Sequence, residues 1–231
     1  MYFSDEGKLK KGENMMDILE VIKDRRSARA FKPDSISRKI ITEILELTIN
    51  APSANNLQPW EFTVVVDKEK ERLSRTLIKA YREKRLSCSS GAVKPLPEAI
   101  KQRGLRTQES LKIYAERIGV SLDNFVNEGS CNFYGAPVAI IICLDDSFSN
   151  RQMIDVGTAL GYMVLAAHDF GLATCPIGLI ADYPDEIKDL LNIPENKKVV
   201  IGIALGYTDR ENPMSQFRSS RAELRELVRW I

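Results

Sequence analysis

A helix predicted over Arg151–Phe170 constrains the fold most, because its residues are apolar on nearly every face. Such a helix has to be packed on several sides, so we expect it at the centre of the molecule, ended by Gly171. Two segments rich in β-branched and apolar residues, Pro137–Leu144 and Lys198–Tyr207, are predicted as buried core strands. Together these segments predict one core of mixed helices and strands.

Shorter elements follow from the spacing of apolar residues and from the turn residues between them. Between Ser87 and Asn132, glycine and proline residues predict the least orderly part of the chain, with only short helical pieces at Gln108–Ile118 and Leu122–Glu128. Strands and helices mix without regular βαβ alternation, which favours the α+β class. The remaining predicted elements are helices at Met15–Lys23, Ile40–Ile49 (capped by Ser37), Lys68–Lys84, Pro184–Leu191 and Ala222–Trp230, and strands at Trp60–Val66 and Thr174–Ile177.

Composition argues against several classes of protein. The 231 residues are 44% hydrophobic, enough for one substantial core, and a formal charge of +1 gives no global field for nucleic acid or a membrane surface. The longest apolar stretch, Val156–Ala167, is shorter than the roughly 20 residues of a membrane span. Met1–Asn14 is a polar tail without a signal-type segment, so we expect a cytoplasmic protein. The cysteines are scattered and His168 is the single histidine, so no zinc site is expected.

The first chemistry-bearing motif is the basic cluster that ends at Phe31. In an extended segment alternate side chains share a face, so Arg25, Ser27 and Arg29 should point together while Arg26 points away. Two guanidinium groups and a hydroxyl on one side form a receptor for phosphate and neighbouring carbonyl oxygens. A basic patch at a helix end, satisfying carbonyls there, explains the same residues equally well.

The second motif is the proline-braced turn Ala51–Trp60, which carries Asn55 and Asn56. An asparagine amide has donors and an acceptor, so it can match the alternating N–H and C=O edge of a flavin pyrimidine ring. Ordinary turn chemistry before a core strand accounts for the same residues. Spacing alone does not separate the two interpretations.

Together the two motifs resemble the nitroreductase family, whose signature pairs an Arg-x-Ser-x-Arg or similar near the N-terminus with Pro-Ser-x-x-Asn-x-Gln-Pro-Trp. The likeness extends from about Met16 to Trp230, apart from a middle insertion at about 85–132. Its further matching segments are Gly171-Leu172, Cys175-Pro176-Ile177-Gly178, Gly206-Tyr207 and Phe217-Arg218-Ser219-Ser220-Arg221-Ala222-Glu223-Leu224.

The resemblance implies an α+β fold with a central, mainly antiparallel sheet surrounded by helices, formed by residues 15–231 after a tail at 1–14. It also implies an intertwined homodimer with two sites at its interface. The bound cofactor would be FMN, visited transiently by NADH or NADPH, which passes a hydride to flavin N5. A small planar aromatic acceptor, such as a nitroaromatic or a quinone, would then be reduced; neither nucleic acid nor a membrane is an expected partner.

The resemblance also assigns roles to residues. Arg25 and Arg221 match a clamp on the flavin phosphate, and Arg29 matches a cation near flavin N1 and O2. The Gly178 backbone N–H matches a donor near N5, so Gly178 and Arg29 are the expected catalytic residues. Pro52, Ser53 and Asn56 match residues that reach the flavin of the neighbouring subunit. The full expected cofactor-binding set is Arg25, Arg26, Ser27, Arg29, Pro52, Ser53, Ala54, Asn56, Asn132, Pro176, Ile177, Gly178, Arg218 and Arg221.

Three features depart from the family pattern or extend it. Ser219 stands where many relatives have lysine, so phosphate binding would lean on Arg218, and Gly178 stands where a glutamate is common. Residues 79–117 carry ten Lys/Arg against four Glu, which suits either a basic lid over the substrate side or a solvated face. Two other functions remain open: a reductive dehalogenase or similarly specialised flavin enzyme of the same fold, and a non-catalytic flavin-binding protein.

Overall fold

The computed structural model describes residues 17–88 and 91–231, which form an α+β fold around one sheet. The sheet has four strands in the order β1 (Trp60–Val66), β2 (Val138–Asp145), β4 (Lys197–Gly206) and β3 (Ala173–Ile177). Every neighbouring pair is antiparallel. Strand β2 is buried from its first residue to Leu144, as its unbroken apolar sequence predicts.

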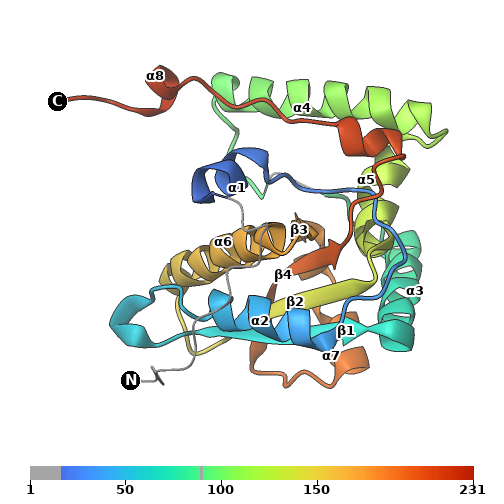
Figure 1. Cartoon of the computed structure of the whole chain (residues 1–231), viewed down its shortest axis with the longest axis vertical. Coiled ribbons are helices and arrows are strands. Elements are labelled where there is room, and N and C mark those ends of the chain that lie inside the picture. The colour runs from blue at the N-terminus through green and yellow to red at the C-terminus, as the bar shows by residue number, and fades with distance from the viewer. Residues whose placement is uncertain (1–16, 89–90) are drawn as a thin grey trace.

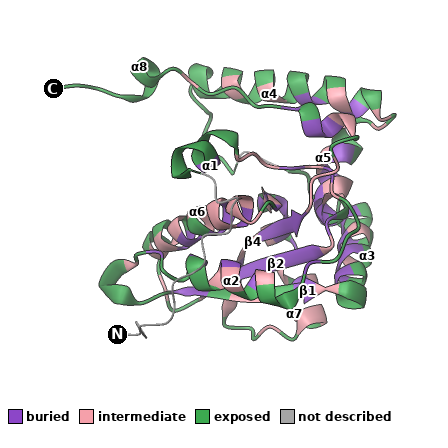
Figure 2. Ribbon diagram, viewed as in Figure 1, coloured by how far each residue is buried: buried purple, intermediate pink, exposed green. Residues whose placement is uncertain are grey.

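Helices cover both faces of the sheet (Figure 1). On one face, α2 (Arg38–Thr48) and α6 (Met153–Asp169) pack against side chains such as Ile140 and Ile142. On the other face, α3 (Asp67–Lys84) and α7 (Pro184–Leu191) pack against Ile141. Figure 2 shows the buried residues concentrated in the sheet and in the helix sides that face it.

The predicted central helix is only partly covered within the single chain. Five residues of α6, among them Ala159 and Met163, are buried against the core. Ile154 and Tyr162 on the same helix are 70% and 42% exposed. One apolar face of α6 is therefore open to solvent in the isolated chain.

Two predictions were wrong. The middle of the chain contains one long helix, α4 (Glu98–Arg117), which runs through Gly104, followed by α5 (Leu122–Cys131). A glycine in a helix interior costs only about 1 kcal/mol, which the packing of Leu111 and Ala115 outweighs. At the other end, the predicted helix over Ala222–Trp230 shrinks to α8 (Leu224–Leu227).

The remaining elements follow the sequence closely. Helix α1 (Ile18–Asp24) begins after Asp17, whose carboxylate accepts a hydrogen bond from the backbone N–H of Leu19, and Ser37 caps α2 in the same way. Met15 and Met16, the predicted start of the first helix, lie outside the described residues. None of the described helices is long and apolar enough to cross a membrane. Short 3-10 turns occupy Ala54–Asn56, Phe133–Gly135, Asn150–Gln152, Gly178–Asp182 and Pro213–Gln216.

Candidate functional site

The basic segment after α1 lies beside β3 and the end of β4. The backbone N–H of Ala28 donates to the carbonyl of Thr174 (2.9 Å), and that of Lys32 donates to the carbonyl of Tyr207 (2.9 Å). The segment is extended, and its burial alternates: Ala28 and Ala30 are buried, whereas Ser27 and Arg29 are half-buried on the other side. Burial thus alternates over residues 27–30, whereas Arg25 and Arg26 are both half-buried.

Arg25 and Arg221 form a pair of like charges that joins the two ends of the chain. Burial, followed by the charge of Arg221, lowers the pKa of Arg25. The Arg221 guanidinium donates only to its own neighbours, including Ser219 Oγ at 2.7 Å. No ion pair to either arginine occurs among the described residues. Two cations held together without an acid make an anion receptor.

Arg29 is held by two aromatic residues. Its guanidinium lies over the ring of Phe217, 5.6 Å from the centroid. The guanidinium also lies near the hydroxyl of Tyr134, whose pKa it lowers; that hydroxyl lies 3.1 Å from Ser130 Oγ. Burial is the main cause that raises the pKa of Tyr134 to about 12, so this hydroxyl stays neutral. Sequence reasoning missed this role of Tyr134.

Tyr134 sits in a strained turn at the end of α5. Phe133 and Tyr134 both have φ 52° and Gly135 has φ 78°. The ammonium of the buried Lys70 donates to the carbonyl of Asn132 at 3.1 Å, directly before this turn. Lys70 thus fixes the backbone of Asn132, one of the predicted cofactor residues, and no local pattern marked Lys70 as part of the site.

The predicted segment over the ring face, Pro176–Gly178, ends β3 and begins the following 3-10 turn. A Cβ atom built on Gly178 would meet no atom within 4 Å. A flat ring could therefore approach the backbone here, although a side chain would also fit. Cys175, just before it, is buried, and burial raises the pKa of its thiol to about 11.

The asparagine turn lies far from the arginine pair within one chain. Asn55 and Asn56 have φ 50° and 57°, which asparagine tolerates better than most residues. The backbone N–H of Ala54 donates to Asp155 Oδ2 at 3.3 Å, at the beginning of α6. Besides burial, the charge of Arg25 lowers the pKa of His168, which lies near the end of α6. A helix rises 1.5 Å per residue, so roughly 20 Å separates the two ends.

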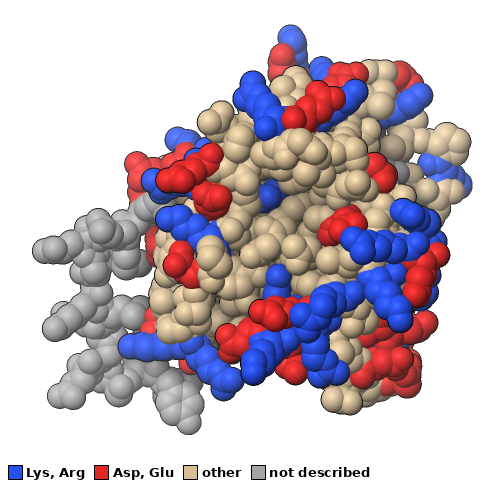
Figure 3. Space-filling model, turned by 90° about the vertical axis from the view of Figure 1, so that its right-hand side faces the viewer, with Lys and Arg blue, Asp and Glu red and all other residues tan. Residues whose placement is uncertain are grey.

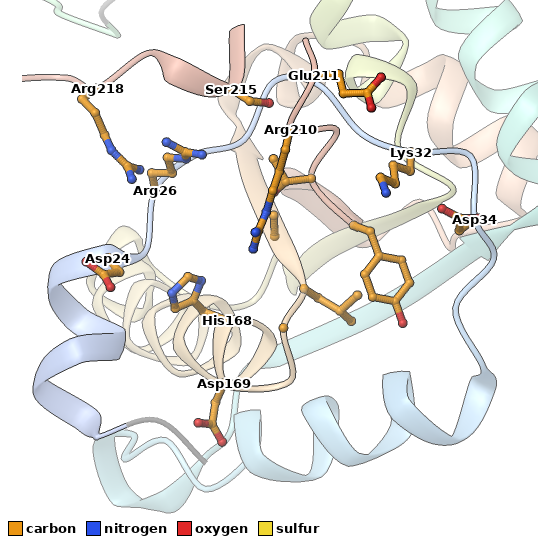
Figure 4. A pocket seen from close by; sticks show the side chains of 15 residues that line it. Asp24, Arg26, Lys32, Asp34, His168, Asp169, Arg210, Glu211, Ser215 and Arg218 are labelled. Carbon is orange, nitrogen blue, oxygen red and sulfur yellow. The ribbon is translucent and has the colours of Figure 1, made fainter. Parts of the chain in front are cut away.

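Arg26 and Arg218 face a different cavity. The charges that lower the pKa of Arg26, after burial, are those of Arg218 and Arg210. These three side chains and His168 line one cavity, shown in Figure 4, to which Arg25 and Arg221 do not contribute. The structure therefore divides the predicted basic set into two clusters.

Ion pairs neutralise much of the basic middle segment. Six of its ten cations are paired, three of them with distant acids: Arg82 with Glu128 at 2.8 Å, Lys84 with Glu186 at 2.6 Å and Arg103 with Glu226 at 2.9 Å. On the face drawn in Figure 3, blue and red side chains are interspersed around a hollowed, mostly tan centre in which some blue atoms show. The positive and negative charges on this face are therefore mixed, without a large region of one sign.

Comparisons with known proteins agree with one another. The model of a family described as "Nitroreductase family" matches residues 22–207. A 4-nitrobenzoate reductase of Pseudomonas putida is 32% identical over 89% of this chain and 91% of its own length. Nitroreductase NfnB of Mycolicibacterium smegmatis is 31% identical, covering 91% of both chains. The crystal structure of an FMN-dependent NfnB from Mycobacterium smegmatis in complex with NADPH has a TM-score of 0.82 and 29% identity, covering 92% of this chain and 97% of that one.

Proposed function

Because this chain belongs to the nitroreductase family, we propose that it is an FMN-dependent oxidoreductase that uses NADH or NADPH to reduce a planar acceptor. A nitroaromatic such as a nitrobenzoate is the first acceptor to test, since a relative at 32% identity is a 4-nitrobenzoate reductase. A quinone is the second. Bound FMN would supply the redox chemistry, taking a hydride from the nicotinamide and passing electrons to the acceptor.

The pairing of Arg25 with Arg221 is the observation that carries this proposal. The two guanidinium groups repel each other, and no described acid pairs with them. A phosphate monoester would relieve that repulsion and accept several hydrogen bonds at once. Ser27, on the same side of the extended segment as Arg25, adds a hydroxyl to the same receptor.

The remaining site residues suit the ring system of a flavin. The positive charge of Arg29, held by Tyr134 and Phe217, would stabilise negative charge on the ring. The open space at the Cβ position of Gly178 would let a ring edge come close to the backbone there, whose N–H is the proposed donor. Both residues therefore keep the catalytic roles that we propose for them.

We further propose that the active form is a homodimer with shared sites. Pro52, Ser53 and Asn56 lie near the beginning of α6, whereas Arg25 lies near its end, so one chain does not bring them over one ring. A second copy of the chain could supply its own asparagine turn to the site around Arg25. The apolar surface for such contact exists: Ile18, Leu19 and Ile154 are 58%, 60% and 70% exposed. In Figure 1 the C-terminal arm projects away from the body of the chain, as an arm that embraces a partner would.

An absorption spectrum of the purified protein tests the cofactor, and anaerobic titration with NADPH and NADH tests the electron donor. We expect a yellow protein whose flavin is bleached by a reduced nicotinamide and re-oxidised by 4-nitrobenzoate. Faster re-oxidation by a halotyrosine would instead indicate a dehalogenase. A yellow protein that neither nicotinamide bleaches would indicate flavin binding without turnover.

A further inference from the structure

A large cavity lies next to the basic segment that carries the proposed cofactor clamp. It has a volume of about 1300 Å³ and opens between the ends of α1 and α6 and the segment that follows β4. Arg25, Ser27, Arg29, Gly178 and Arg221 do not line it. Arg25 and Arg26 are neighbours in an extended segment, so their side chains leave it on opposite sides. The cavity is therefore distinct from the proposed flavin site.

One wall of this cavity is basic. Figure 4 shows Arg26, Arg210 and Arg218 gathered at one end, with His168 below them. None of the three arginines has a hydrogen bond or ion pair from its side chain to another described residue. Burial and the charges of Arg218 and Arg210 lower the pKa of Arg26, so the three repel one another. A multiply charged anion would remove this repulsion and use several donors at once.

The rest of the cavity is mixed in charge, with Lys32 as its one further cation. Asp24 and Asp34 also line it, and their carboxylates can accept hydrogen bonds from hydroxyl or amino groups. Asp169 and Glu211 complete the acidic lining but point away from the three arginines in Figure 4. Leu172, Ala173 and Tyr207 also line the cavity and contribute apolar atoms to it. A simple inorganic anion would leave this part of the cavity unused.

We propose that this cavity is a second ligand site, which binds a nucleoside diphosphate through Arg26, Arg210 and Arg218. The diphosphate would sit on the three guanidinium groups, while the sugar hydroxyls and the base face the carboxylates and the apolar surface. Its volume exceeds the roughly 300–1,000 Å³ common for small-molecule pockets, so a nucleotide fits. The site is separate from the flavin and does not depend on the proposed reaction.

His168 provides a direct probe, because it is the only histidine in the chain and it lines the cavity. Its pKa is lowered by burial first; Arg25 and Arg218 also lower it, whereas Asp24 and Asp169 raise it. A bound diphosphate would offset the arginine charges. ADP added to the FMN-loaded protein should therefore move the imidazole NMR signals and raise the pKa of His168, without releasing flavin.

The decisive variant is Arg210→Gln, which removes one cation that has no part in the proposed flavin site. We expect at least a tenfold weaker affinity for ADP, with flavin content and turnover unchanged. Arg225→Gln is the matched control, since Arg225 is exposed, pairs with Glu223 and does not line the cavity, so its affinity should equal that of the wild type. Inorganic pyrophosphate should bind more weakly than ADP, because it lacks the nucleoside.

Four results would overturn the proposal. The first is a His168 signal that stays unchanged at millimolar ADP and low ionic strength. The second is equal ADP affinity in Arg210→Gln and the wild type. The third is pyrophosphate binding as tight as that of ADP, which would remove the nucleoside from the assignment. The fourth is flavin release by ADP, which would place the nucleotide on the cofactor clamp instead.

Discussion

Arg25 and Arg221 come from opposite ends of the chain and lie so near each other that burial and the charge of Arg221 together lower the pKa of Arg25. Such an arrangement is unfavourable until an anion arrives, since like charges repel in a partly desolvated site. Folding therefore brings together two groups whose proximity is useful only when a ligand is bound. This relationship leads to a prediction about stability whose sign depends on the cofactor.

Replacing Arg25 with Met should stabilise the flavin-free protein and destabilise the protein loaded with FMN. Without the anion the change removes a repulsion worth less than about 1 kcal/mol, because Arg221 is exposed to solvent; with the anion it removes a charged hydrogen-bond partner, worth roughly 1.5–3 kcal/mol. Thermal unfolding of the stripped and the reloaded variant measures both effects. Arg225→Met, on the exposed C-terminal arm, is the control and should change neither. Shifts of the same sign in both forms would refute the assignment of this clamp.

Arg29→Ala should lower the two-electron reduction potential of the flavin by about 30–60 mV, because a cation near the ring stabilises its negatively charged reduced form. Tyr134→Phe keeps the ring but loses the hydroxyl that lies near Arg29, so it should shift the potential in the same direction by less. Arg117→Ala removes a cation that lies over Tyr114 instead, 5.1 Å from the centroid, and serves as the control. Spectroscopic titration against a reference dye gives these potentials. Unchanged values for Arg29→Ala would exclude its proposed role.

The sheet and its flanking helices were predictable because their signals are local. The apolar run of β2, the Ser37 cap of α2 and the proline at the start of α7 each act within a few residues of one another. The prediction of a longer C-terminal helix was wrong because such a helix depends on contacts outside its own segment. Leu224 and Leu227 are 70% and 63% exposed, so the amphipathic pattern has no surface within the chain to pack on.

The site was predictable only in part. The shared face of Ser27 and Arg29 follows from the geometry of an extended segment, which the sequence shows directly. The role of Tyr134 depends on a turn with positive φ and on contact with a residue far away in the sequence, and no spacing encodes either. The grouping of Arg26 with Arg210 likewise requires the folded path of the chain after β4.

Lys70 should make the stability of the protein depend on alkaline pH. Burial is the main cause that lowers the pKa of its ammonium to about 8, from 10.5 for an ordinary lysine. Between these values the unfolded chain binds more protons than the folded one, so the contribution of Lys70 to the free energy of unfolding rises with pH. Below about pH 8 the full cost of burying the charge applies, at most on the order of 3 kcal/mol.

Lys70→Met removes this dependence, although it leaves the carbonyl of Asn132 without its donor. From pH 7 to pH 10.5 the stability of the wild type, relative to the variant, should therefore increase by up to about 3 kcal/mol. Urea unfolding of both proteins across this range measures the difference, and the other titrating groups cancel. Parallel pH profiles would show that the Lys70 ammonium is not buried in solution.

The last prediction concerns the division of one site between two chains. Arg25→Ala removes the clamp, and Asn56→Gly removes the amide while keeping a residue that tolerates the φ of 57°. Each variant alone should lose most of its activity. If every site combines Arg25 of one chain with Asn56 of the other, mixing the two variants creates heterodimers with one native site and one doubly altered site.

Subunit exchange should therefore restore about one quarter of the wild-type activity, since half of the dimers are mixed and each holds one intact site. Exchange between the wild type and the chain carrying both changes should do the opposite, lowering the activity from about one half to about one quarter, because mixed dimers then hold only singly altered sites. The two mixtures thus approach the same value from opposite directions. Sites built within single chains would give no recovery in the first mixture and no loss in the second.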